Sequence, residues 1–229
     1  MDHFFQNAYD AMNDEQRESF CRTVFLHDPS DFAASLRREY YAGKLRHMGK
    51  NVRIGAGVKI INPQYISLGD NVQLSDHVTL IARGPGSIEI GDWVNINDRV
   101  YLDTENEDGY IHIGTGAYIG TGTTLFGHQG LEIGDHSLLA QNITLTPYSH
   151  IFADPDQNII QQGGHCKKVV IGRDVYIGMG VCVMYSGDIE DGSVIGAGSV
   201  VVKPIPPYSV AVGNPARVIK KREKKEQGR

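Results

Sequence analysis

The feature that most constrains the fold is an aliphatic residue that recurs every six positions from about residue 54. A period of six fits neither the 3.6-residue period of a helix nor the simple alternation of an isolated strand. It suits short strands joined by tight turns, with one aliphatic side chain pointing inward from each strand. Three such strands close a triangular coil, and stacked coils share one core. The repeat positions are Leu68, Leu74, Leu80; Ile90, Ile96, Leu102; Ile113, Ile119, Leu125; Ile133, Leu139, Leu145; and Ile171, Ile177, Val183, Ile189, Ile195, Val201.

Glycine often follows the aliphatic position, as in Ile-Gly-Asp at 90–92 and 133–135 and Ile-Gly-Arg at 171–173. A small residue there predicts a tight corner that a bulkier side chain would obstruct.

Extra residues interrupt the hexads at 81–89, 103–112, 126–132 and 146–170. The last insertion is the longest, and it contains Pro147-Tyr148-Ser149-His150. We expect it to project from a corner of the solenoid. Loops on a rigid scaffold are where binding and chemistry are most often found.

The ends of the chain lack the repeat. Residues 1–50 predict a helical extension of two short helices, the second capped by Ser30-Asp31 and running through roughly 32–45. Residues 51–203 form the predicted β-helix with a catalytic loop at 146–170, and residues 204–229 form a capping segment and basic tail. Pro204, Pro206 and Pro207 are expected to stop further strand addition and protect the open end.

Composition excludes several classes of function. A formal net charge of −5 without a basic stripe argues against nucleic acid as a partner. Three widely spaced cysteines indicate neither a disulfide framework nor a zinc site, which fits a reducing cytoplasm. The start Met1-Asp2-His3-Phe4-Phe5 lacks the character of a signal peptide, and no apolar run is long enough to span a membrane.

Three C-terminal features carry a family resemblance. Residues 195–201 (Ile-Gly-Ala-Gly-Ser-Val-Val), the Pro206-Pro207 turn and residues 212–219 (Val-Gly-Asn-Pro-Ala-Arg-Val-Ile) resemble the end of the hexapeptide-repeat acetyltransferases, and the likeness covers about residues 50–220. This family includes sugar and polysaccharide O-acetyltransferases. The resemblance implies a left-handed parallel β-helix, acetyl-CoA as co-substrate without a metal, and a homotrimer whose active sites lie between protomers.

Residues 133–150 resemble the family's catalytic region, which makes His150 the candidate general base. Spacing supports this choice, because His150 lies five residues beyond Leu145 and His128 lies three beyond Leu125 on the coil before. Both histidines are therefore expected on one edge. An imidazole with a pKa near neutrality suits removal of a proton from an acceptor hydroxyl and its delivery to the departing thiolate.

The resemblance also implies donor and acceptor residues. The cofactor-binding positions that it implies are Tyr176, Gly178, Met179, Ala197, Val202, Lys203, Arg217 and Lys220. Arg217 and Lys220 have cationic side chains suited to nucleotide phosphates. The acceptor-binding positions are Gly120, where galactoside-type enzymes have Asn, and His128, where they have an acidic residue. These departures make a galactoside a doubtful acceptor, while Asn62-Pro63 and residues 66–71 look more like the enzymes of surface-polysaccharide assembly.

Other functions on the same scaffold remain open. The nearest is N-acetylation of an amino-sugar nucleotide, which shares the donor and needs less base strength. A catalytically silent trimeric scaffold and a longer donor such as succinyl-CoA are further alternatives. A carbonic-anhydrase-like zinc site is disfavoured, because the histidines at 128, 136, 150 and 165 include no close pair.

Overall fold

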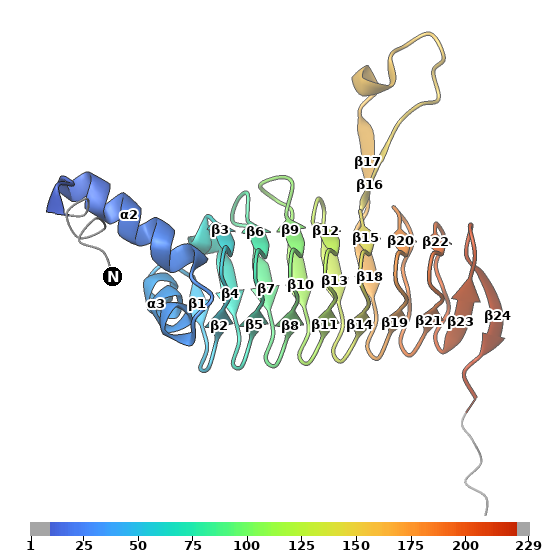
Figure 1. The fold of residues 1–229 in the computed structure, drawn as a ribbon. Coiled ribbons are helices and arrows are strands. Elements are labelled where there is room, and N and C mark those ends of the chain that lie inside the picture. The colour runs from blue at the N-terminus through green and yellow to red at the C-terminus, as the bar shows by residue number, and fades with distance from the viewer. Residues whose placement is uncertain (1–9, 224–229) are drawn as a thin grey trace, which may run out of the picture.

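The computed structural model describes residues 10–223 and shows a parallel β-solenoid of about seven turns (Figure 1). The chain passes through three sheets in the same order on every turn. Sheet A contains β1 (His47–Met48), β4 (Ile66–Leu68), β7 (Ile88–Ile90), β10 (Ile111–Ile113), β13 (Leu131–Ile133) and β18 (Val169–Ile171). Sheet B contains β2 (Arg53–Ile54), β5 (Gln73–Leu74), β8 (Asn95–Ile96), β11 (Tyr118–Ile119), β14 (Leu138–Leu139), β19 (Tyr176–Ile177), β21 (Val194–Ile195), β23 (Ser209–Val212) and β24 (Arg217–Lys221). Sheet C contains β3 (Lys59–Ile61), β6 (Thr79–Ile81), β9 (Tyr101–Asp103), β12 (Thr124–Phe126), β15 (Thr144–Leu145), β20 (Cys182–Val183) and β22 (Val200–Val201).

The predicted hexad residues are buried, but they form only part of the core, because the residue two positions earlier is buried as well, as Ile88 is beside Ile90. Ile119 is fully buried and is in register with Ile96 on one side and Leu139 on the other. Burying a side chain of this size stabilises the fold by roughly 1.5–3 kcal/mol relative to leaving it exposed. The stacked hexads therefore supply a continuous core along the axis, and the predicted β-helix of hexapeptide repeats is confirmed.

The glycine after the aliphatic residue has a different role from the one expected. Gly91 is not in a left-handed conformation, and a Cβ on it would lie 3.0 Å from the backbone nitrogen of Thr115 on the next coil. The left-handed corner residue is instead Trp93, with a φ of 58°. Glycine is therefore favoured at this position because neighbouring coils stack closely. The next residue, Asp92, accepts a hydrogen bond from the backbone N–H of Asp70 at 2.7 Å.

Two helices precede the first coil. They are α2 (Asp14–His27) and α3 (Asp31–Ala42), and the Ser30 side chain caps α3 by accepting the Ala33 N–H. α3 ends three residues earlier than the predicted Leu45, with Gly43 at its C-cap. The expected N-terminal extension and C-terminal tail also include residues 1–9 and 224–229, which lie outside the described residues.

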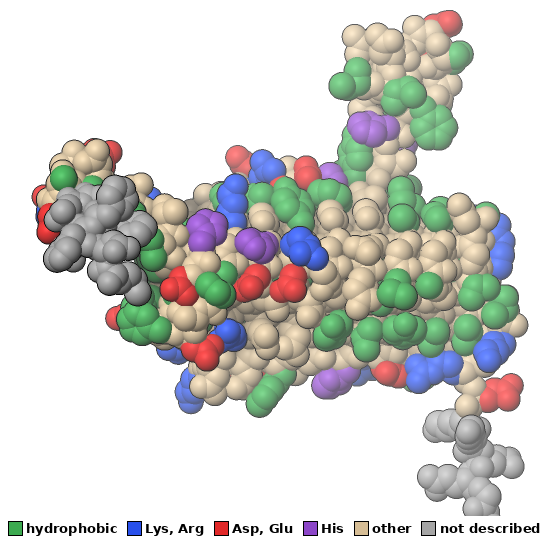
Figure 2. All heavy atoms as spheres, in the orientation of Figure 1, with side chains coloured by type: hydrophobic (Ala, Val, Ile, Leu, Met, Phe, Trp, Pro, Cys, Tyr) green, Lys and Arg blue, Asp and Glu red, His purple; other side chains and the backbone are tan. Residues whose placement is uncertain are grey.

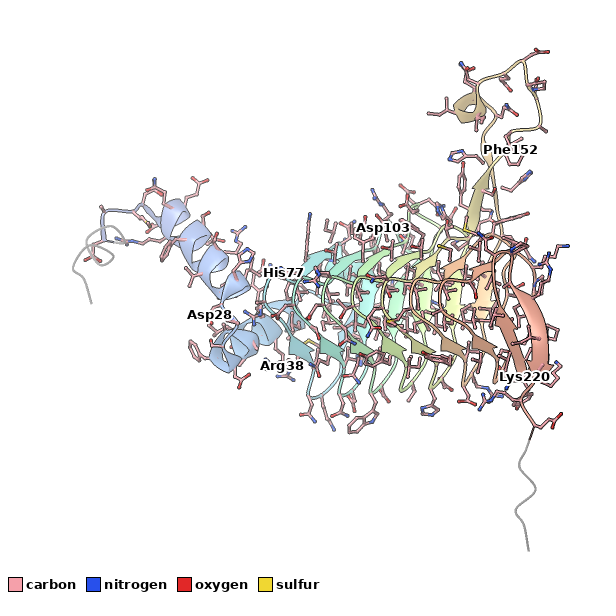
Figure 3. All side chains as sticks on the ribbon, turned by 45° about the vertical axis from the view of Figure 1, so that its right-hand side comes forward. Asp28, Arg38, His77, Asp103, Phe152 and Lys220 are labelled. Atoms are coloured by element: carbon pink, nitrogen blue, oxygen red, sulfur yellow. The ribbon has the colours of Figure 1, made fainter. Side chains whose placement is uncertain are left out.

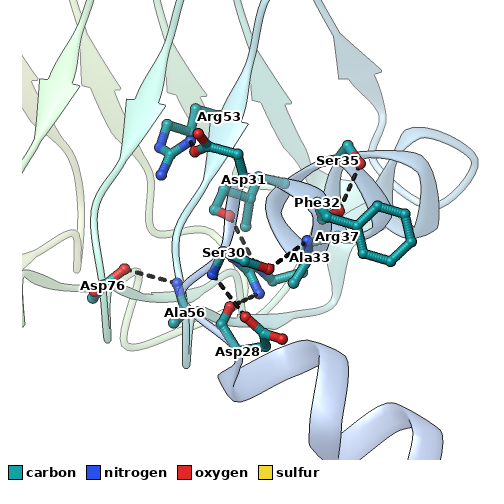
Figure 4. A network of polar contacts seen from close by, with 11 residues as sticks. Asp28, Ser30, Asp31, Phe32, Ala33, Ser35, Arg37, Arg53, Ala56 and Asp76 are labelled. Atoms are coloured by element: carbon teal, nitrogen blue, oxygen red, sulfur yellow. Dashed lines mark hydrogen bonds and ion pairs between the residues drawn. The ribbon is translucent and has the colours of Figure 1, made fainter.

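A buried guanidinium fastens the helices to the solenoid (Figure 4). Arg37 of α3 donates to the carbonyl oxygens of Ile54 on β2 and of Phe25 and Asp28 at the end of α2. Burial lowers the pKa of Arg37, partly opposed by the carboxylates of Asp76 and Asp28. One side chain thus joins α2, α3 and the first coil.

The expectation that the prolines end strand addition is wrong. Ile205 still bridges Ile189, and β23 continues sheet B by pairing in parallel with β21. Pro206 and Pro207 lie in the corner between these two pairings, and Pro204 lies in the preceding corner, before Ile205, so that none of them has to donate a ladder N–H. The sheet ends instead with β24, which folds back antiparallel on β23. None of the helices described is both long and apolar enough to cross a lipid bilayer.

Candidate active site

The insertions all leave the solenoid where sheet C passes to sheet A, which we call the C–A corner. The longest forms an antiparallel hairpin of β16 (Tyr148–His150) and β17 (Gly164–Cys166), which projects from the solenoid in Figure 1. Its far end carries the short helix η2 (Ile159–Gln161) and a turn in which the Asp154 carboxylate accepts the Asp156 N–H. Asp154 therefore stabilises a turn. His150 lies closer to the solenoid, at the end of β16.

Five rings form a row along this corner. The centroid distances are 6.2 Å from Tyr101 to Phe126, 6.1 Å from Phe126 to His128, 5.0 Å from His128 to Tyr148 and 4.8 Å from Tyr148 to His150. We call these residues the aromatic row. The row begins on β9, crosses β12 and ends on the hairpin, so it spans three successive coils.

The two predicted histidines lie on the same edge, with Tyr148 between them. His150 is exposed, and its Nδ1 lies 3.3 Å from the Tyr148 Oη. His128 is partly buried, and this burial lowers the pKa of its imidazole, although Glu105 and Asp103 act in the opposite direction. A neutral His128 keeps one donor and one acceptor nitrogen, which suits hydrogen bonding to a hydroxyl.

A buried carboxylate supports the start of the row. Asp103 is fully buried and receives two hydrogen bonds from Arg83, one from the Tyr101 hydroxyl and one from the Glu105 N–H. Burial by itself would raise the pKa of Asp103, but these donors outweigh burial and hold its pKa below the ordinary value. Burial and the Asp103 bond raise the pKa of Tyr101 to about 12. Its phenol therefore stays protonated near neutral pH.

Gly120 does not join the histidines. It lies at the other end of the sheet C strands, at the corner between sheets B and C, where it is buried. A Cβ on Gly120 would lie 2.5 Å from the carbonyl carbon of Ala140 on the next coil. This contact gives glycine a steric role at that position.

The eight predicted cofactor-binding residues fall in three places. Tyr176, Gly178, Met179 and Ala197 lie on sheet B or at its corner with sheet C; Val202 and Lys203 follow β22 at the C–A corner; and Arg217 and Lys220 lie on β24. Gly178 packs on Ala197, because a Cβ there would lie 2.6 Å from the Ala197 nitrogen. Figure 3 shows Lys220 at the lower end of the last strands, opposite the hairpin that carries Phe152. A single chain therefore does not gather these eight positions into one cleft.

A concave surface lies elsewhere, on sheet A. A groove of about 720 Å³ runs along the outer face of sheet A and is lined by His47, Glu89, His112 and Glu132, among others. Histidine and acidic side chains gather on this face in Figure 2. The groove does not include His150. Within residues 10–223, no three His, Cys, Asp or Glu side chains form a group able to hold a metal ion.

Sequence reasoning missed Tyr148, Phe126, Tyr101 and Asp103 as members of this site. A partial signal existed, because Phe126 and Tyr148 fall in the same two insertions as the histidines. The positions of these residues relative to the six-residue repeat do not predict which rings contact each other on neighbouring coils.

Comparisons with known proteins agree with the fold. A family profile described as "Hexapeptide repeat of succinyl-transferase" matches residues 168–203. A variant of AntD, an N-acyltransferase from Bacillus cereus in complex with dTDP and coenzyme A, superposes with a TM-score of 0.57 at 22% identity, covering 82% of this chain and 90% of that chain. This superposition shows a shared fold.

Curated relatives carry acyltransferase names. The chain is 34% identical to a probable acetyltransferase of Mycobacterium tuberculosis over 166 residues, which is 72% of this chain and 54% of the relative. It is 39% identical to the galactoside O-acetyltransferase of Escherichia coli over 112 residues, 48% of this chain and 53% of the relative. It is 28% identical to a dTDP-4-amino-4,6-dideoxy-D-glucose acyltransferase of Escherichia coli over 180 residues, 79% of this chain and 84% of the relative. The chain spans about half the length of the first two relatives. With its hexad core and this profile match, the chain is a hexapeptide-repeat protein, and its relatives make it similar to acetyltransferases of that kind.

Proposed function

We propose that this protein is an acetyl-CoA-dependent O-acetyltransferase that modifies a hydroxyl of a sugar or surface-polysaccharide precursor, with His150 as general base. The observation that carries the proposal is the exposed His150 imidazole at the end of the aromatic row. Aromatic rings offer a sugar apolar faces beside polar groups. Here the half-buried His128 imidazole supplies such a polar group.

His150 is assigned two proton transfers in each turnover: it accepts one proton and later donates it. Its Nε2 removes the proton of the acceptor hydroxyl as that oxygen attacks the thioester carbonyl. The carbon–sulfur bond then breaks, and the imidazolium returns the proton to the thiolate of coenzyme A. General-base help of this kind contributes typically about 10²–10⁴-fold, and holding both substrates together contributes further without a covalent intermediate.

The donor side of the proposal requires more than one copy of the chain. The predicted cofactor positions lie at two corners and on β24, which supports a homotrimer in which neighbouring solenoids bring different corners together. Arg217 and Lys220 are exposed and would meet the nucleotide phosphates. Cys166 and Cys182 are free thiols, which supports a cytoplasmic location.

The test is incubation of the protein with acetyl-CoA and a panel of sugars, amino-sugar nucleotides and oligosaccharides. Release of free coenzyme A and product mass are followed, with base-labile esters separated from stable amides. An ester supports the proposal and identifies the acceptor class. Absence of both coenzyme A binding and release would favour the catalytically silent scaffold.

His150→Ala provides the residue-level test. We expect the variant to bind acetyl-CoA as the wild type does, because an exposed side chain is removed, and to turn over at least about a hundredfold more slowly. Steady-state kinetics measure the turnover of the variant, and calorimetry measures its binding of coenzyme A. Normal turnover would remove His150 as the base.

N-acylation of an amino-sugar nucleotide is the second candidate. It is favoured by one observation, the alignment over 84% of an acyltransferase named for a dTDP-amino sugar. The same assay decides between the two, since an amide product would establish this alternative.

A further inference from the structure

Tyr148 is in contact with both histidines of the aromatic row. Its ring stacks on His128 with an interplanar angle of 24° and meets His150 edge to face at 88°. Its hydroxyl oxygen lies 3.3 Å from the Nδ1 of His150. Tyr148 therefore fills the space between the two imidazoles.

The partner strand of the hairpin leaves room for this ring. Gly164 on β17 pairs with His150, and a Cβ on Gly164 would collide with the Tyr148 ring and hydroxyl. Gly164 has no left-handed φ, so its backbone does not itself require glycine. The missing side chain instead makes space for Tyr148, which is held between the Gly164 backbone and the His128 ring.

The contact with Nδ1 bears on which nitrogen of His150 carries the proton. In a neutral imidazole, the hydrogen bond made by one nitrogen selects the protonation state of the other. A phenol oxygen that accepts from Nδ1–H leaves Nε2 unprotonated, and the bond survives when His150 takes a second proton. A phenol that donates to Nδ1 would have to break that bond on protonation, because both imidazolium nitrogens are donors.

No carboxylate competes for this position. Among residues 10–223, no hydrogen bond or ion pair joins His150 to an acidic side chain. On the facing strand, His165 pairs with Ser149 and stacks on Tyr185 at 6.2 Å. The Tyr148 hydroxyl is therefore the side-chain group that contacts Nδ1.

We propose that Tyr148 is a positioning residue that accepts a hydrogen bond from Nδ1–H of His150 and so holds Nε2 free toward the acceptor. Its kinetic consequence rests on the proposed function, whereas the tautomer itself does not.

The first test is nitrogen NMR of the full chain labelled with ¹⁵N-histidine, at a pH where His150 is neutral. The His150 signals are identified by their loss in His150→Ala. We expect the wild type to show a protonated Nδ1 and an unprotonated Nε2, and Tyr148→Phe to lose this preference. Tyr185→Phe, which removes a hydroxyl beside another histidine, should leave the His150 signals unchanged. A protonated Nε2 in the wild type, or an unchanged tautomer in Tyr148→Phe, overturns the proposal.

The second test is kinetic. We expect Tyr148→Phe to lower kcat about tenfold with KM for acetyl-CoA within about twofold, as loss of one oriented hydrogen bond predicts. Gly164→Ala should lower kcat in the same direction by displacing the ring, and Tyr185→Phe should not. Absence of acyl transfer by the wild type would count against the proposed function alone, since the NMR result still decides the role of Tyr148. If the wild type is active and Tyr148→Phe has the same kcat, Tyr148 does not position His150 for catalysis.

Discussion

Asp103 shows how a charge is tolerated beneath the aromatic row. Its side chain is fully buried, whereas its partner Arg83 is about half exposed, with the closest N–O distance at 2.6 Å. The carboxylate oxygens have four donors, so the cost of removing the charge from water is offset by hydrogen bonds. Removing the charge should therefore leave donors unpaired.

For Asp103→Asn we expect a loss of about 2 kcal/mol in the free energy of unfolding at pH 7, less than for a pair buried on both sides because Arg83 reaches water. Because folding lowers the pKa of Asp103, its stabilising contribution is fully present above the ordinary aspartate pKa of 3.8, which applies to the unfolded chain. That contribution is lost as the pH falls through the lower folded value. Urea unfolding of both proteins at pH 7 and pH 3 measures this. A difference that does not shrink at low pH would contradict the assignment.

At the scale of elements, the hairpin and the solenoid are held by different interactions. β16 and β17 pair with each other, while β18 pairs with β13 as part of sheet A. Ile160 at the hairpin's far end is 84% exposed, so it contributes no core to the chain. The far end should therefore be removable without loss of the solenoid.

Replacing residues 153–161 by Asn-Gly should shift the thermal midpoint by no more than about 3 °C, because no buried core is removed and Asn-Gly favours a tight hairpin turn. Circular dichroism during heating measures this shift, with Ile119→Ala in the core as the destabilised comparison. A loss above about 10 °C would mean that the far end packs on protein in solution.

At the scale of the whole molecule, the residues of the proposed acetyl-CoA site lie in separate places on a single chain. A homotrimer should sediment with three times the 25.2 kDa mass of the chain. We expect this mass at micromolar concentration, with or without acetyl-CoA, because the proposed site needs corners from neighbouring solenoids. Analytical ultracentrifugation measures it, and a stable monomer that binds acetyl-CoA would contradict a site between protomers.

The sequence by itself determined the solenoid, its core and the positions of its insertions. The physical reason is that each coil contacts only its neighbours, so a six-residue period specifies one inward side chain in each strand. The residue two positions earlier, such as Val72 or Val94, is also buried, and the predicted positions did not include it. It also predicted that His128 and His150 share an edge, because both follow the last inward residue of successive coils.

Only the tertiary structure decided which side chains meet outside the core. Insertions of different lengths follow their own paths, and hexad spacing does not specify them. Tyr148 contacts both histidines because Gly164 of β17, opposite His150, leaves room for its ring. Asp103 can stay buried beside the row because Arg83 of the preceding coil donates to its carboxylate. Gly120, though near in sequence, lies at a different corner because a strand of sheet C separates it from His128. Contacts between insertions of different coils depend on where each loop lies along the corner, and the six-residue repeat does not encode that position.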